Sequence, residues 1–229
     1  MALDGAFLHT IKSQIESEAM GSRIDKIYQP SREEIVLVLR SRGWVGKLLL
    51  SAGADSPRIH FTQSEMENPK VPPMFCMLLR KHLSGGKLIS VRQLGLDRVL
   101  YLDFETTNEL GDVVMITVAV EIMGRHSNVI VVGPDGKILD AVKRIDRDMS
   151  GVRPIVPGMT YTLPPQQEKL NLMTAKREEI KESILNAKGL DISKSIAAAF
   201  EGFSAVLARE AAFYATHGQE ADKTKLTDD

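Results

Sequence analysis

Two charged side chains, an imidazole, a hydroxyl and an amide lie close together between two apolar stretches of this chain. The polar segment, E-I-M-G-R-H-S-N, occupies residues 121–128; apolar, β-branched runs occupy residues 113–120 and 129–132. Such polar groups have little use in packing a buried strand pair, whereas binding and catalytic residues are often carried on loops of a rigid sheet. Gly124 allows the backbone to bend there. The candidates for a binding site are Glu121, Arg125, His126 and Asn128.

The same segment also fits an ordinary hairpin turn, in which Ser127 and Asn128 cap the backbone and Arg125 points into solvent. Motifs typical of catalysis are missing: the sequence holds no G-x-S-x-G, no P-loop and no H-E-x-x-H, and its five histidines are dispersed. The single cysteine, Cys76, belongs to an apolar helix stripe and is predicted to lie in the core. We therefore expect no catalytic residue, no metal ligand, no cofactor and no small-molecule substrate.

A basic stretch forms a second candidate site. Between residues 70 and 98 there are six Lys/Arg and one acid, Asp97. The helix macrodipole favours cations at a helix C-terminus by roughly 0.3–1 kcal/mol each, which accounts for Arg80 and Lys81 without any ligand. The cations beyond the helix suit contacts with nucleic-acid phosphates. The predicted phosphate-binding or rRNA-binding residues are Arg80, Lys81, Lys87 and Arg92.

Asp97 and Arg98 stand where a strand is predicted to begin. Because neighbouring strand residues point to opposite faces, the two need not pair with each other. One is then available to accept from a base or ribose and the other to bind a phosphate. The alternative is a pair of surface ion pairs with other partners, which contribute little.

The predicted elements around these residues alternate between helix and strand. Apolar residues at helical spacing predict a helix from Asp4 to about Met20, with Asp4 as its N-cap, and a second helix over residues 74–83 after two prolines. Strand-like runs occupy residues 23–28, 35–39, 45–50, 58–61, 88–94, 99–104, 113–122, 129–132 and 138–142. The pattern predicts an α+β domain with a mostly antiparallel sheet or sandwich.

Prolines and glycines punctuate residues 153–165, and helical patterns follow over residues 170–188, 192–200 and 205–215. We place a domain boundary there, giving one domain over residues 1–165 and a small all-α domain over residues 166–229. Within the second domain, Gly202 and Ser204 separate two helices in a pattern similar to a helix-hairpin-helix, whose second helix would offer backbone amides to phosphate. Most helical hairpins bind nothing, which is the alternative. The polar tail after residue 220 is expected to fray.

Composition limits the remaining possibilities. A net charge of −1 over 229 residues gives no global field that would mark a nucleic-acid binder, so any basic surface must be local. One cysteine excludes a disulfide framework and a multi-cysteine zinc site. The start of the chain has no basic, apolar leader and no apolar run approaches 18 residues, so we expect a cytoplasmic protein that does not enter a membrane.

Taken together, three motifs closely resemble the N-terminal region of the NFACT (RqcH/NEMF) family, formerly described as fibronectin-binding protein A. They are P-P-M-F-C-M-L-L-R-K-H-L at 72–83, L-D-R at 96–98 and E-I-M-G-R-H-S-N at 121–128. Further parts of the pattern are L-D-G at 3–5, R-P at 153–154, P-G-M-T-Y at 157–161 and P-P-Q at 164–166. The resemblance spans nearly the whole chain.

This resemblance implies an N-terminal domain with the fold of formamidopyrimidine-DNA glycosylases, followed by a helix-hairpin-helix domain. It implies a role in ribosome-associated quality control: binding a large ribosomal subunit that holds peptidyl-tRNA, and recruiting tRNA, alanyl-tRNA in bacteria, for an untemplated C-terminal tail. The family's tRNA-recruiting residues fall on Asp4, Asp97 and Arg98. Its coiled coil and C-terminal RNA-binding domain would follow residue 229, so tailing is not expected of this chain alone.

Two other classes of function remain as alternatives. An active DNA glycosylase of this fold needs an N-terminal proline nucleophile with a neighbouring glutamate, whereas Ala2 and Leu3 occupy those positions here. A glycosylase zinc finger also needs more than one cysteine. A fibronectin-binding adhesin would need an export signal, which the sequence does not show.

Overall fold

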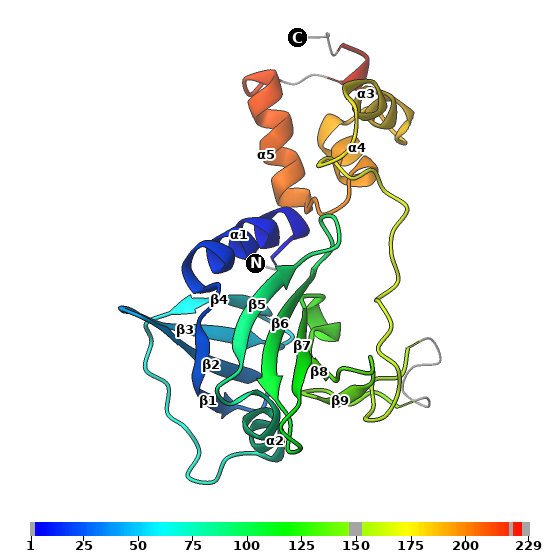
Figure 1. Cartoon of the computed structure of the whole chain (residues 1–229). Coiled ribbons are helices and arrows are strands. Elements are labelled where there is room, and N and C mark those ends of the chain that lie inside the picture. The colour runs from blue at the N-terminus through cyan, green and yellow to red at the C-terminus, as the bar shows by residue number, and fades with distance from the viewer. Residues whose placement is uncertain (1–2, 147–152, 220–221, 226–229) are drawn as a thin grey trace. The chain divides into compact units, whose positions relative to one another are not determined.

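The computed structural model describes residues 3–146, 153–219 and 222–225 (Figure 1). The polar tail predicted to fray falls mostly outside this range. The chain divides into two compact units. The first comprises Met1–Leu3, Leu8–Gln93 and Arg98–Pro164, and the second comprises Asp4–Phe7, Leu94–Asp97 and Pro165–Asp229. The two short segments of the second unit were not expected from the sequence, which placed residues 1–165 together.

A single antiparallel sheet dominates the first unit. Its nine described strands follow the order β4-β3-β2-β1-β5-β6-β7-β8-β9. They are β1 (Arg23–Ser31), β2 (Glu34–Ser41), β3 (Trp44–Ser51), β4 (Arg58–Thr62), β5 (Lys87–Arg92), β6 (Val99–Thr107), β7 (Val113–Glu121), β8 (Asn128–Val132) and β9 (Ile138–Ala141). Where β1 meets β5, the register contains one pair, Arg23 with Lys87. The sheet therefore has two halves that diverge from this narrow junction.

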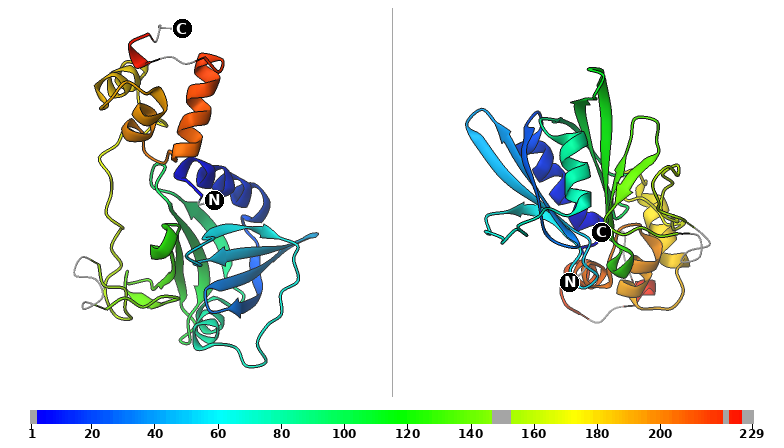
Figure 2. Two further views of the ribbon diagram at one scale, coloured as in Figure 1. Left: turned by 180° about the vertical axis from the view of Figure 1, so that it is seen from behind. Right: turned by 90° about the horizontal axis from the view of Figure 1, so that it is seen from below.

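Two helices fill the space between the diverging halves, as the right panel of Figure 2 shows. Helix α1 (Gly5–Ala19) buries Leu8, Ile11, Ile15 and Ala19, whose spacing of three and four residues places them on one face. Helix α2 (Met74–Leu83) buries Phe75, Cys76, Leu79 and Leu83. These side chains join strand residues from both halves in one core. Full burial of a large apolar side chain stabilises by about 1.5–3 kcal/mol, so the helices hold the two halves together.

The chain covers part of the opposite face of the sheet with its own continuation. Val99, Tyr101 and Ile130 form a second apolar cluster with Ile155. Isolated backbone bridges join Ile145 to Ile155 and Lys137 to Thr160. Residues 153–162 are thus tied along β9 and over this cluster.

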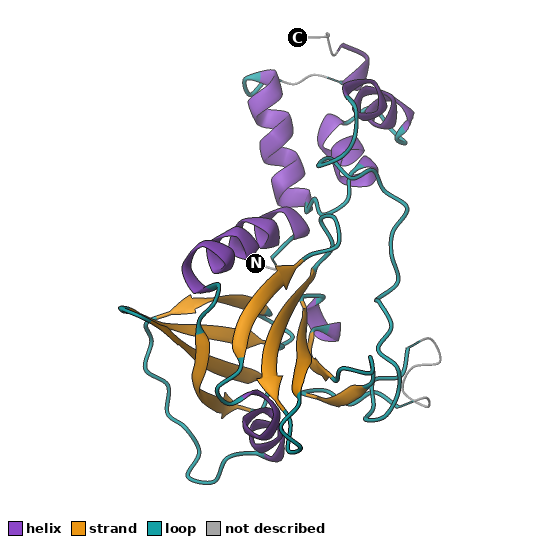
Figure 3. Ribbon diagram, viewed as in Figure 1, coloured by secondary structure: helices purple, strands orange, loops and turns teal. Residues whose placement is uncertain are grey.

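Three helices form the second unit: α3 (Arg177–Asn186), α4 (Ile192–Ala199) and α5 (Ala205–Thr216), coloured purple in Figure 3 with the short η2 (Lys223–Lys225). Their core contains Ile192, Ile196, Phe200 and Ala208. Ser204 caps α5 by accepting from the Leu207 amide at 3.1 Å, as predicted.

The predicted helix over residues 170–188 begins seven residues late, at Arg177. Leu170 instead exchanges backbone hydrogen bonds with Ala199 and Glu201, at 2.9 and 3.0 Å. The Asn171 side chain accepts from the Met173 amide at 2.9 Å, which forms a local turn. Tertiary pairing and turn chemistry therefore outweigh helical periodicity here.

No helix in the described part of the chain is both long enough and apolar enough to cross a bilayer.

Candidate functional site

Segment 121–128 joins β7 to β8 through a short 3-10 turn, η1 (Gly124–His126). Glu121 and Asn128 face each other as the last register pair of the two strands. Gly124 has φ +57°, a left-handed conformation that favours glycine. The Ser127 hydroxyl oxygen accepts from the Met123 amide at 2.7 Å and closes the turn. The turn is therefore built by the segment's own polar groups.

Glu121 lies at the buried end of this segment. Its side chain is 0% exposed. Its two carboxylate oxygens accept from the Arg153 guanidinium at 2.9 and 2.6 Å, and the Tyr161 hydroxyl donates to it at 2.9 Å. The remaining Nε of Arg153 donates to the Thr162 carbonyl at 2.7 Å. Glu121 thus anchors residues 153–162 to the end of β7.

Two groups of this cluster, Arg153 and Tyr161, have raised pKa values. Burial alone would lower the pKa of Arg153, but the Glu121 carboxylate outweighs burial and raises it. Burial, reinforced by the charge of Glu121, raises the pKa of Tyr161, so its hydroxyl remains a donor. The Arg153 guanidinium also lies 5.1 Å from the centre of the Tyr161 ring.

Asn128 fixes the other end of the segment. It is 1% exposed. Its amide nitrogen donates to the Lys143 carbonyl at 2.7 Å, and its amide oxygen accepts from the Lys143 amide at 3.0 Å. Ser127 and Asn128 therefore bind the backbone, as the hairpin-turn alternative predicted, whereas the structural use of Glu121 was not predicted from the sequence. The two exposed residues of the segment are Arg125 and His126, whose side chains are joined by a 3.0 Å hydrogen bond.

Arg98 lies beside this segment in the first unit. Its carbonyl accepts from the Ile122 amide at 2.8 Å, directly before β6 begins. Its side chain is exposed. The structure thus places three of the predicted residues at the same edge of the sheet, Arg98 directly before β6 and Arg125 and His126 after the end of β7.

Asp4 and Asp97, by contrast, belong to the second unit. One oxygen of Asp4 accepts from the Phe7 amide at 2.9 Å and caps α1. The other accepts from the Ser204 hydroxyl at 2.6 Å and the Ser204 amide at 3.3 Å. Asp97 accepts from the Gln166 side-chain amide at 2.8 Å. Asp4 is therefore shared between the starts of two helices, α1 and α5.

Close backbone approach explains the glycines of this region. A Cβ on Gly5 would lie 1.6 Å from the Leu96 carbonyl oxygen, and a Cβ on Gly202 would lie 2.6 Å from the same atom. Leu94–Asp97 thus packs directly on the backbone of residues 5 and 202. The predicted strand over residues 88–94 ends at Arg92 instead, because Leu94 to Asp97 form a turn closed by an Asp97 N–H to Leu94 C=O bond of 3.0 Å.

Acids from outside the basic stretch neutralise part of it. Lys81 lies 3.0 Å from Glu109, and Arg92 binds Asp103 through two bonds of 2.6 and 2.9 Å. Burial alone would raise the pKa of the Asp103 carboxyl, but the bonds from Arg92 and its neighbours together hold it below its ordinary value.

Arg80 donates twice to the Ile27 carbonyl, at 3.0 and 2.8 Å. Of the four predicted phosphate-binding residues, Lys87 alone forms neither an ion pair nor a side-chain hydrogen bond within the described residues. The phosphate-binding surface stays a prediction. Three of its four predicted residues already bind other groups of the chain.

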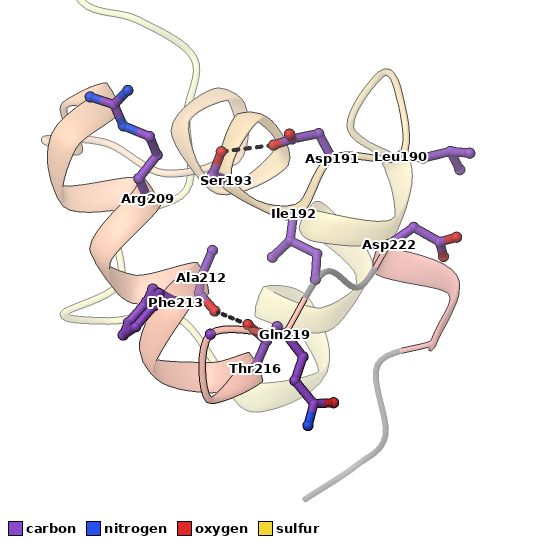
Figure 4. Close-up of a pocket in the computed structure, with 11 residues that line it drawn as sticks. Leu190, Asp191, Ile192, Ser193, Arg209, Ala212, Phe213, Thr216, Gln219 and Asp222 are labelled. Atoms are coloured by element: carbon purple, nitrogen blue, oxygen red, sulfur yellow. Dashed lines mark hydrogen bonds between the residues drawn. The ribbon is translucent and has the colours of Figure 1, made fainter.

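A cavity of about 540 Å³ lies within the second unit (Figure 4). Asp191, Ser193, Arg209 and Phe213 contribute to its lining. The Asp191 carboxylate is occupied by the Lys194 amide and the Ser193 hydroxyl, at 2.8 and 2.7 Å. No predicted site residue lines this cavity. Among the described residues no group of three or more His, Cys, Asp or Glu side chains is arranged to hold a metal ion.

The fold and these contacts define an α+β protein with a large antiparallel sheet and a smaller helical unit. A family model described as NFACT N-terminal and middle domains matches residues 4–229, and the chain belongs to this family. Its sequence is 41% identical over 213 residues to the Rqc2 homolog RqcH of Streptococcus suis, covering 93% of this chain and 38% of that protein.

Two further relatives describe the range of the family. The solved N-terminal region of the fibronectin/fibrinogen-binding protein of Streptococcus suis is 40% identical, with a TM-score of 0.86, covering 96% of this chain and 81% of that one. The human ribosome quality control complex subunit NEMF is 30% identical over 97 residues, 42% of this chain and 9% of NEMF. The chain spans less than two-fifths of the bacterial RqcH relative.

The buried Glu121–Arg153 pair generates the first prediction. Glu121→Ala leaves Arg153, whose side chain is 12% exposed, without its counter-charge. We expect a loss of about 3–5 kcal/mol in the free energy of unfolding. The measurement is urea unfolding followed by fluorescence of Trp44, the single tryptophan, which lies in the first unit.

Glu109→Ala is the matched control, because Glu109 also pairs with a cation but is 79% exposed. It should change the unfolding free energy far less than Glu121→Ala does, because exposed ion pairs contribute little to stability. Equal effects of the two substitutions would show that Glu121 is not an anchor.

Asp4→Asn tests the Asp4 carboxylate, which is shared between the starts of α1 and α5. As a cap alone, Asn serves as well as Asp, so the sequence predicts a change of a few tenths of a kcal/mol. The structure revises this expectation, because Phe7 and Ser204 bind different carboxylate oxygens of Asp4, whereas Asn has one oxygen and a nitrogen that cannot accept. We expect a loss of about 1 kcal/mol by thermal unfolding, and a non-additive effect with Ser204→Ala. Additive effects would contradict the Asp4–Ser204 bond.

Proposed function

We propose that this chain is the tRNA-recruiting part of a ribosome-associated quality control factor. The family membership supports the assignment, as do relatives named RqcH and a ribosome quality control complex subunit. The observation that carries it is a group of exposed side chains: Arg125 and His126 on a segment anchored at both ends, and Arg98 directly before β6 at the same edge of the sheet. Such a group needs little reorganisation to meet a ligand.

The chemistry of these side chains suits RNA. Arginine offers a planar fork of donors that fits phosphates and base edges. Arginine and histidine planes also stack on the unpaired bases through which proteins recognise RNA in sequence-specific ways. Asp97, adjacent to Arg98 in the chain, adds an acceptor for a base or ribose. Recruitment of this kind involves no bond making or breaking by the protein, so the proposed role is not enzymatic.

The proposal extends in its details to alanyl-tRNA as the recruited species and to a large ribosomal subunit holding peptidyl-tRNA as the partner, in the cytoplasm. Tailing of the nascent chain would need the remainder of a full-length protein, because this chain spans 38% of its RqcH relative. The α4–α5 hairpin, with Gly202 in its turn and Ser204 as cap, is proposed as a helix-hairpin-helix that contacts phosphate. The glycosylase-like fold of the first unit is likewise a proposal.

Fibronectin binding is the second candidate, since the solved relative is described as a fibronectin/fibrinogen-binding protein. The two candidates differ in their dependence on Arg98. Binding of fibronectin to the immobilised chain, measured with and without Arg98→Ala, separates an adhesive surface from the proposed RNA site.

Arg98→Ala is the direct test of tRNA binding. We expect the dissociation constant for tRNA to rise by about tenfold, because a lost arginine contact to RNA corresponds to about 1–3 kcal/mol by analogy with base readout in DNA. Electrophoretic mobility shift at fixed salt gives the affinity, and the melting temperature should change little. Arg42→Ala, an exposed arginine in the turn between β2 and β3, is the control. Unchanged tRNA affinity in a folded Arg98→Ala protein would contradict the assignment.

A further inference from the structure

A concavity of about 790 Å³ opens in the first unit beside η1. The β1–β2 turn, the start of α2, η1 and the residues after β9 each form part of its wall. Its volume falls in the range of sites that hold small organic groups, about 300–1,000 Å³. Arg125 and His126, the exposed pair of the proposed RNA site, line it.

The charges of this concavity do not cancel. Four cations line it, namely Arg32, Arg125, Lys143 and Arg144, against two acids, Glu33 and Asp140. Lys143 lies 3.1 Å from Glu33, and Arg144 binds Asp140 through two bonds of 2.8 Å. Within the described part of the chain no carboxylate pairs with Arg32 or Arg125. Two positive charges therefore remain for an anionic ligand.

The same wall has an apolar portion. Met74 is 86% exposed, although it is a large apolar side chain at the start of α2. Phe75, Val142 and Ile145 also line the concavity. A ligand that fits this lining carries both a negative charge and an apolar surface.

The wall is held rigidly. The Asn128 amide binds the Lys143 backbone in both directions, at 2.7 and 3.0 Å. The Lys143 ammonium donates to the Ala52 carbonyl at 2.6 Å. Because Ala52 follows β3, this bond connects the residues after β9 to the other half of the sheet. The groups that support η1 are thus the same groups that fix the concavity.

We propose that this concavity holds one unpaired nucleotide of the bound RNA. Its phosphate lies against Arg32 and Arg125, and its base packs on Met74 and the neighbouring apolar lining. Unpaired, splayed-out bases are the usual targets of sequence-specific RNA recognition, and a nucleotide combines the required charge with a flat apolar face. The inference rests on the proposed tRNA-binding function and adds a nucleotide pocket to it.

The test compares two charge reversals in the 229-residue chain. Arg32→Glu and Arg42→Glu alter exposed arginines in the turns of successive hairpins, but only Arg32 lines the concavity. We expect Arg32→Glu to weaken tRNA binding by about tenfold or more, and Arg42→Glu by less than about twofold. Equal effects of the two would overturn the proposal.

Met74→Ser tests the base, because it removes apolar surface without changing charge. A fall in affinity of about fivefold supports a packed base, by analogy with base stacking on aromatic side chains. Unchanged affinity would show that only a phosphate binds, and would overturn the nucleotide site. Competition with 5′-AMP distinguishes a nucleotide within tRNA from a free mononucleotide. Displacement of tRNA by micromolar AMP in an Arg32-dependent way would identify a site for a free mononucleotide instead.

Failure of this proposal is distinguishable from failure of the proposed function. If the chain binds tRNA and Arg98→Ala weakens that binding while Arg32→Glu does not, only the nucleotide pocket is wrong. If the unmodified chain does not bind tRNA at any salt concentration tested, both proposals are wrong.

Discussion

The buried ion pair between Glu121 and Arg153 is the interaction on which the candidate site depends. Removing two charges from water is costly, and the cost is offset only where geometry and further hydrogen bonds are favourable. Both conditions hold here: the pair is bidentate, Tyr161 donates a third bond to the carboxylate, and the Thr162 carbonyl accepts from the remaining Nε. The end of β7 and residues 153–162 are consequently fixed together, and η1 starts from a rigid base.

This arrangement divides the polar segment by role. Glu121, Ser127 and Asn128 direct their polar groups inward, where each has a defined partner. Arg125 and His126 face outward. A loop fixed in this way loses little conformational freedom when a ligand binds, which favours affinity. Asp4 has a comparable role in the second unit, since its two oxygens join the starts of α1 and α5.

Local patterns predicted most elements, because apolar spacing and prolines or glycines at their ends act within a few residues. All nine described strands, α1, α2, the helical hairpin and the buried Cys76 follow from such patterns. Partners distant in sequence were not predictable. Asp103 and Glu109 neutralise Arg92 and Lys81 from outside the basic stretch, and Ser204 lies 200 residues from Asp4. The buried partner of Glu121 is 32 residues away, so the sequence placed Glu121 only among the candidates for a binding site.

The most direct test of this division of roles is Arg125→Ala, with tRNA affinity and the free energy of unfolding measured on the same protein. If Arg125 is an outward-facing contact residue, its replacement should lower the affinity about tenfold and change the unfolding free energy by no more than about 0.5 kcal/mol. Unchanged affinity, with the fold intact, would contradict the account that η1 presents an RNA-binding surface.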